Sequence, residues 1–166
     1  MKLHSPFASA PLIVIWETTR ACALACRHCR AEAIPHRNPK ELSTTEAFRL
    51  VDAIAECGKP VFVLTGGDPF MRDDLAKIVE FAVFRGLRTA VSPSATGRLK
   101  DASLEALARA GCHRISLSID AATAAEHDAF RGVKGSFART LDGVRLGLYP
   151  KNARKPKNPV TGRSES

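Results

Sequence analysis

The chain has 166 residues, of which 45% are hydrophobic and 25% charged, a composition typical of a soluble globular domain with room for a sizeable core. No apolar run approaches the roughly 20 residues of a membrane helix, and Glu17 and Arg20 interrupt the first apolar stretch, so we expect no signal peptide and a cytoplasmic protein. The net charge of +8 does not indicate nucleic acid as a partner, because half of the excess lies in residues 151–166, where no aromatic residues accompany the basic ones.

Strand-like and helix-like segments alternate from residue 11 onward. Short β-branched runs predict strands at 11–17, 60–65, 87–93 and 113–120, the first of them buried. Helical periodicity with capping and glycine signals predicts helices from Ser43 to Gly58, from about residue 73 to Gly86, around 104–111, after the Thr123-x-x-Glu126 box, and after Ser136 as a cap.

This alternation predicts an α/β fold, with a parallel sheet in sequential strand order and helices on its outer face. In such folds the functional residues gather at the carboxyl ends of the strands. The unusual segments of this chain all lie at those ends: three cysteines after the first strand, Gly66-Gly67-Asp68-Pro69 after the second, a polar loop at 92–97 after the third, and Ser118 and Asp120 at the fourth. We therefore expect one site at this edge.

Three cysteines, Cys22, Cys26 and Cys29, share one loop in a Cys-x3-Cys-x2-Cys pattern. Thiolates are the ligands that iron–sulfur centres prefer, and three of them on a [4Fe–4S] cubane leave one iron open to a small molecule. The alternative is a zinc half-site completed by His28, His36 or Cys57, but structural zinc sites use paired knuckles and the sequence has no second one. The spacing favours the cluster.

On these residues the sequence resembles the radical S-adenosylmethionine (SAM) superfamily, whose signature is Cys-x3-Cys-x2-Cys with an aromatic-type residue, here His28, before the last cysteine. Gly66-Gly67-Asp68-Pro69 is similar to the family's Gly-Gly-Glu-Pro motif. The surroundings of both motifs, WETTRACALACRHC and LTGGDPF, are similar to a subgroup of haem-biosynthesis and peptide-maturation enzymes with SPASM-type C-terminal extensions. The resemblance spans residues 11–146.

The resemblance implies a [4Fe–4S] cluster and bound SAM, which is cleaved to a 5′-deoxyadenosyl radical that abstracts hydrogen from an unidentified substrate, a haem precursor or a peptide. A flavodoxin- or ferredoxin-like protein would donate the electron. It assigns the metal to Cys22, Cys26 and Cys29. It assigns SAM to His28 at the adenine, Gly66, Gly67, Asp68 and Pro69 at the amino group, Ser118 at the ribose and Arg131 at the carboxylate.

The family core is a partial (β/α) barrel of six units, whereas this chain shows four. We expect residues 1–148 to be the N-terminal part of such a core in a truncated chain, and 149–166 to be a disordered basic tail. An open edge and an uncovered apolar face at the last strand would favour self-association or a C-terminal partner. The alternative to an enzyme is a catalytically silent fragment, or an iron–sulfur or zinc-binding module.

Five further residues receive structural predictions. Cys57 and Cys112 are expected to be small buried hydrophobic residues, and Asp120 a cap for the helix that follows it. His113 and His127 are expected at the surface.

Overall fold

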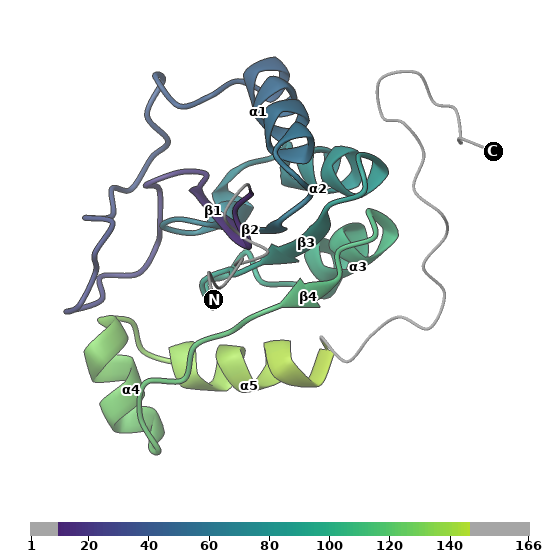
Figure 1. Cartoon of the computed structure of the whole chain (residues 1–166). Helices are drawn as coiled ribbons and strands as arrows, with labels where there is room; N and C mark the ends of the chain where they lie inside the picture. The colour runs from purple at the N-terminus through teal and green to yellow at the C-terminus, as the bar shows by residue number, and fades with distance from the viewer. Residues whose placement is uncertain (1–9, 147–166) are drawn as a thin grey trace, which may run out of the picture.

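The computed structural model describes residues 10–146, in which four strands, five α-helices and one 3-10 helix follow one another along the chain (Figure 1). The elements are β1 (Ile13–Glu17), α1 (Thr44–Glu56), β2 (Val61–Thr65), η1 (Pro69–Met71), α2 (Leu75–Phe84), β3 (Arg88–Val91), α3 (Asp101–Arg109), β4 (Arg114–Ile115), α4 (Ala124–Arg131) and α5 (Ser136–Leu146). The tail predicted at 149–166 lies outside the described residues. Between residues 10 and 146, no helix combines the length and the apolar character needed to cross a bilayer.

The four strands form one parallel sheet in the order β1-β2-β3-β4. In the central register Ile15 lies beside Val63, Val63 beside Ala90, and Ala90 beside Arg114. The predicted fold class and strand order are confirmed. Because all strands run the same way, the segments that leave their carboxyl ends meet at one edge of the sheet.

One face of the sheet carries the hydrophobic core. Phe62 and Leu64 of β2 are fully buried against apolar side chains of α1, α2 and α3, among them Ile78 and Leu107. The predicted capping box orients α1: the Ser43 hydroxyl accepts the Glu46 amide, and the Glu46 carboxylate accepts the Ser43 amide at 2.8 Å. These helices lie together on one side of the strands (Figure 1).

The other face of β1 is open, which corrects the prediction of a buried strand. Val14 and Trp16 pack against the core, but Ile13 and Ile15 are 50% and 62% exposed. Successive side chains of a strand point to opposite faces, so Ile13 and Ile15 point away from the helices that cover Val14 and Trp16. Exposed apolar side chains are thus found at β1 and also beyond the end of β4, where Ile119 is 52% exposed.

β4 is much shorter than the predicted strand at 113–120. Its neighbour β3 ends at Val91, and the Ser116 amide makes the last ladder bond, to the Val91 carbonyl at 3.0 Å. Residues beyond this point have no strand partner within the described chain, and residues 118–120 contact α4 instead.

The two C-terminal helices begin close to the predicted residues. Thr123 caps α4, as predicted, by accepting the Glu126 amide. Ser136, predicted as a cap, is instead the first residue of α5. The Asp128 carboxylate of α4 supplies the cap, because it accepts the Phe137 amide at 2.8 Å and the Gly135 amide.

The two remaining cysteines differ from each other. Cys112 packs against the core as predicted, and burial raises the pKa of its thiol to about 11. Cys57 is exposed at the end of α1, so the prediction that it is buried is wrong. Cys57 is the C-terminal cap of α1, and the chain turns at the following residue, Gly58.

Candidate functional site

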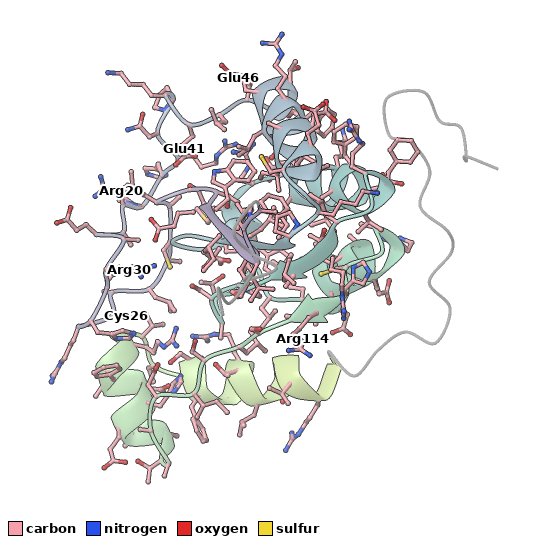
Figure 2. The ribbon with its side chains drawn as sticks, viewed as in Figure 1. Arg20, Cys26, Arg30, Glu41, Glu46 and Arg114 are labelled. Carbon is pink, nitrogen blue, oxygen red and sulfur yellow. The ribbon has the colours of Figure 1, made fainter. Side chains whose placement is uncertain are left out.

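The cysteine loop, residues 20–34, leaves the carboxyl end of β1 and carries all three cysteines of the motif. Figure 2 labels Cys26 on this loop. Cys22 is buried, and Cys26 and Cys29 are half-buried. Two of the sulfur atoms already accept backbone amides: Leu24 donates to Cys22 Sγ and Ala33 to Cys29 Sγ, each at 3.4 Å. Such amides favour a sulfur atom that carries negative charge, as a metal-bound thiolate does.

Several neighbouring groups act on the thiol of Cys26. Burial raises the pKa of Cys26, the charge of Arg131 lowers it, and the nearby Cys22 and Cys29 raise it again. Among residues 10–146, no three Cys, His, Asp or Glu side chains converge closely enough to hold a single metal ion. A cubane cluster gives each cysteine an iron of its own, so a three-thiol loop with amide donors fits it without such convergence.

The glycines of the Gly66-Gly67-Asp68-Pro69 turn, which follows β2, make room for the cysteine loop. A Cβ on Gly66 would lie 2.3 Å from the Thr19 carbonyl, and one on Gly67 would lie 2.5 Å from the Ala21 carbonyl. The Gly67 amide donates to Thr19 at 2.8 Å, and the Asp68 amide donates to Ala21 at 2.7 Å. The sequence predicted close approach of a ligand here, whereas the approach seen is that of the backbone entering the cysteine loop.

The Asp68 carboxylate points into the protein. It is fully buried and accepts the Thr96 hydroxyl at 2.6 Å and the amides of Phe70 and Ser94 at 3.1 and 3.4 Å. Burial raises its pKa, and these hydrogen bonds act in the opposite direction. Asp68 therefore joins the turn after β2 to the loop after β3. Its carboxylate is engaged inside the protein, so only its backbone groups remain for the site. Pro69, also buried, begins η1.

The C-terminal end of α4 packs against the cysteine loop from the other side. The Ala25 amide donates to the Arg131 carbonyl at 3.1 Å, and the Arg27 amide donates to the Phe130 carbonyl at 3.0 Å. Both carbonyls belong to the last helical turn and have no partner within the helix. A Cβ on Gly132, whose φ is +68°, would lie 2.7 Å from the Ala25 carbonyl, so a glycine is required at this contact.

His28 is exposed and stacks on the ring of Phe130, with ring centroids 4.5 Å apart and planes 13° apart. The predicted partner of the His28 ring is the adenine of SAM, and the partner seen in this structure is a side chain of α4. The two stacked rings form a flat surface at the residue that precedes Cys29.

Arg131, Ser118 and Asp120 meet between β4 and α4. The Nε atom of Arg131 donates to the Asp120 carboxylate, and Nη2 donates to the Ser118 carbonyl at 3.3 Å. Asp120 was predicted as a helix cap, but Thr123 fills that role. The structure brings Ser118 and Arg131 together, and the Arg131 carbonyl contacts the residue before Cys26.

His127 is fully buried, so its predicted surface position is wrong. It stands four residues before Arg131 on the same face of α4, and its Nδ1 accepts the Asp120 amide at 3.2 Å. The sequence did contain a signal for this position. Once the Thr123 cap fixes the start of α4, residues four apart such as His127 and Arg131 lie on one face of the helix.

Two side chains hold the entrance of the cysteine loop, and neither was predicted from the sequence. Glu41 accepts the Thr19 hydroxyl at 2.8 Å and the Arg20 amide at 3.1 Å (Figure 2). The buried Arg72 makes two bonds to Asp74 and donates to the Thr18 carbonyl at 3.3 Å. The start of the loop is therefore fixed by charged hydrogen bonds.

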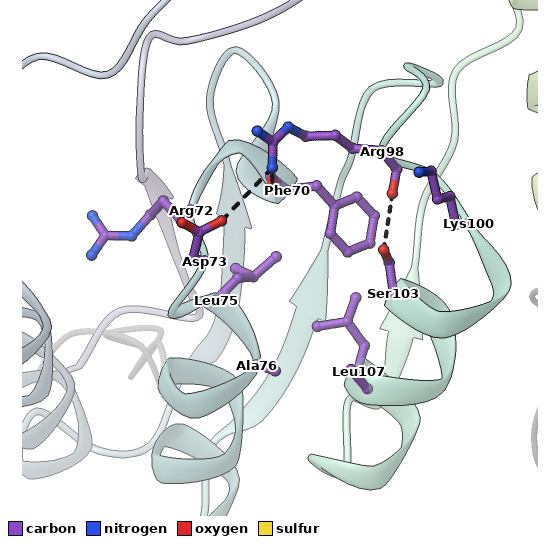
Figure 3. Close-up of a pocket in the computed structure, with 10 residues that line it drawn as sticks. Phe70, Arg72, Asp73, Leu75, Ala76, Arg98, Lys100, Ser103 and Leu107 are labelled. Carbon is purple, nitrogen blue, oxygen red and sulfur yellow. Dashed lines mark hydrogen bonds and ion pairs between the residues drawn. The ribbon is translucent and has the colours of Figure 1, made fainter.

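A pocket of about 280 Å³ lies on the helix-covered side, between η1, α2 and α3 (Figure 3). Phe70, Leu75 and Leu107 form its apolar wall, and Arg98 and Lys100 stand at its rim. None of the three motif cysteines lines it. It adjoins the glycine turn through Phe70 and is separate from the cysteine loop.

Residues 16–146 match the family model of the radical SAM superfamily, and the chain belongs to this superfamily. Over 132 residues it is 43% identical to the AdoMet-dependent heme synthase of Nitratidesulfovibrio vulgaris, a match that covers 80% of this chain and 36% of the relative. It is 36% identical over 132 residues to the PqqA peptide cyclase of Ruegeria pomeroyi, covering 80% and 35%. The chain thus spans about a third of the length of the curated relatives it matches.

A solved structure shares the fold. Streptococcus suis SuiB, in a crystal with the precursor peptide SuiA, matches with a TM-score of 0.66 at 17% sequence identity, over 84% of this chain and 31% of SuiB. This likeness concerns the fold alone, that is, the arrangement of the parallel sheet and its helices.

Proposed function

We propose that this chain binds a [4Fe–4S] cluster through Cys22, Cys26 and Cys29 and binds SAM beside it, as part of an enzyme that cleaves SAM to a 5′-deoxyadenosyl radical. The observation that carries the proposal is the placement of the three-thiol loop between the glycine turn and the end of α4, with amides on two of the sulfurs. In this proposal residues 1–148 are the cluster- and SAM-binding part of a radical SAM core.

The residues of this chain have separate tasks in the proposal. When bound, the cluster supplies the electron that breaks a carbon–sulfur bond of SAM. Backbone groups of Gly66, Gly67 and Asp68 orient the amino group, with Pro69 fixing the turn behind them. The guanidinium fork of Arg131 suits the carboxylate. Ser118 is assigned to the ribose.

His28 is assigned to the adenine, a flat apolar surface that suits the exposed ring pair it forms with Phe130. A ring on the rim of the cysteine loop would hold the adenosyl group close to the cluster. It would also cover part of the site against water, which protects a reactive radical.

For the substrate we propose a haem precursor, in view of the 43% identity to a haem synthase, and as a second candidate a peptide, in view of the PqqA peptide cyclase. A flavodoxin- or ferredoxin-like protein is the proposed electron donor. The free thiols suit a reducing compartment, and we propose the cytoplasm.

The test is anaerobic reconstitution of the chain, followed by iron and labile sulfide analysis, a SAM-binding titration, and detection of 5′-deoxyadenosine after addition of dithionite. We expect one cluster per chain, saturable SAM binding and 5′-deoxyadenosine. Bound zinc without sulfide would indicate the zinc-module alternative. A cluster with no SAM cleavage would indicate a silent fragment.

A further inference from the structure

The polar contacts between the end of β4 and α4 centre on one ion pair. Asp120 holds Arg131 through Nε, while Nη2 of Arg131 is held by the Ser118 carbonyl. The third nitrogen, Nη1, donates to no residue in the described part of the chain. Two of the three guanidinium nitrogens are thus fixed, and one terminal nitrogen is left for a ligand.

Asp120 is itself held in place. Its backbone amide donates to Nδ1 of the fully buried His127, whose ring packs edge-on against Phe137. The side chains of Asp120 and Arg131 are only 16% and 10% exposed. A guanidinium this deeply buried is costly to leave without its carboxylate, so the pair fixes the direction in which Arg131 points.

The pair lies next to the cluster ligands. The carbonyl of Arg131 accepts the Ala25 amide, one residue before Cys26. Because Asp120 is paired with Arg131, the ion pair lies beside the loop that carries Cys26.

We propose that Asp120 is a positioning residue for SAM: it aims the guanidinium of Arg131 so that Nη1 receives the carboxylate of the methionyl group. The proposal rests on the proposed function, in which Arg131 binds that carboxylate. Asp120 does not touch SAM, and its effect is confined to recognition of one ligand group.

The experiment compares SAM with decarboxylated SAM in binding titrations on the reconstituted full chain, with iron content and thermal unfolding measured in parallel. In Asp120→Asn we expect the affinity for SAM to fall roughly tenfold, as for loss of one charge-assisted hydrogen bond. Affinity for decarboxylated SAM and iron content should stay near wild type. Arg131→Lys, which keeps the charge and loses the fork, should show the same selective loss.

The matched control is Glu105→Gln, which breaks the exposed Glu105–Arg109 pair on α3 and should change neither affinity. The proposal is overturned if Asp120→Asn keeps the wild-type preference for SAM, or if it weakens both ligands and iron loading alike. If Asp120→Asn does not fold, Asp120→Glu, which keeps the carboxylate but displaces it from Nε of Arg131, decides by the same criterion. A wild-type chain that holds a cluster but binds no SAM overturns the proposed function together with this inference, whereas a wild type that binds SAM with an unchanged preference in Asp120→Asn overturns the inference alone.

Discussion

The helix-covered face of the sheet and the cysteine-loop side are held together by different forces. On the first, apolar side chains such as Phe62, Leu64 and Ile78 are completely removed from water. On the second, the contacts are backbone hydrogen bonds, glycines at close approach and buried ion pairs. Apolar burial tolerates small shifts, whereas hydrogen bonds and close backbone contacts do not. Substitutions on the helix-covered face should therefore lower the stability of the fold, whereas those on the cysteine-loop side should lower the binding of iron or SAM.

The largest effect is expected from the motif cysteines. Replacement of Cys22, Cys26 or Cys29 by Ala should remove most of the bound iron, because the cluster would lose one of its three protein ligands. Iron and sulfide per chain after reconstitution are the measurement. Cys57→Ala and Cys112→Ala are the controls and should bind nearly as much iron as the wild type. A requirement for Cys57 equal to that for Cys29 would refute the three-ligand site.

Loss of packing on the helix-covered face should be the next largest effect. Phe62→Ala should lower the free energy of unfolding by about 3–5 kcal/mol, since it removes a fully buried ring. Ile15→Ala, on the open face of the adjacent strand, should change it by no more than about 0.5 kcal/mol. Urea unfolding followed by circular dichroism measures both. Similar costs for the two variants would show that the open face is covered in solution.

Gly67→Ala tests the close approach that links the two sides. Its Cβ would lie 2.5 Å from the Ala21 carbonyl, so the cysteine loop must shift, at a cost of about 1–3 kcal/mol. Because the cysteine loop itself must move, we expect lower iron content as well as weaker SAM binding. Gly97→Ala is the matched control, because a Cβ there meets no atom within 4 Å. Full iron loading in Gly67→Ala would contradict this reading.

The smallest effect concerns the cap of α5. The amides of Phe137 and Gly135 lower the pKa of Asp128 below its ordinary 3.8. A lowered folded-state pKa adds stability that is complete above the unfolded value and is lost as the pH falls toward the folded value. Asp128→Asn should therefore unfold at a lower temperature than the wild type at pH 7, and the gap should close as the pH falls below 3.8. A gap that is constant with pH would refute the charged cap.

The sequence by itself determined the order of elements, the capped start of α1, the parallel sheet and the three-cysteine loop. Each of these depends on residues close together in the chain: hydrophobic periodicity, a four-residue capping box, and a metal-ligand spacing within one loop. The gathering of functional segments at one edge then follows from the parallel order alone.

Only the tertiary structure decided what the individual residues of the site contact. Asp120 resembles a helix cap in sequence, but its partner is Arg131, at the far end of α4. The turn at Gly67 is crowded by residues 20–21, which are distant from it in the chain. The shortness of β4 and the open face of β1 depend on which strands and helices stand beside them. Local patterns specify each element, but these contacts arise between elements, and they exist only after the elements have packed.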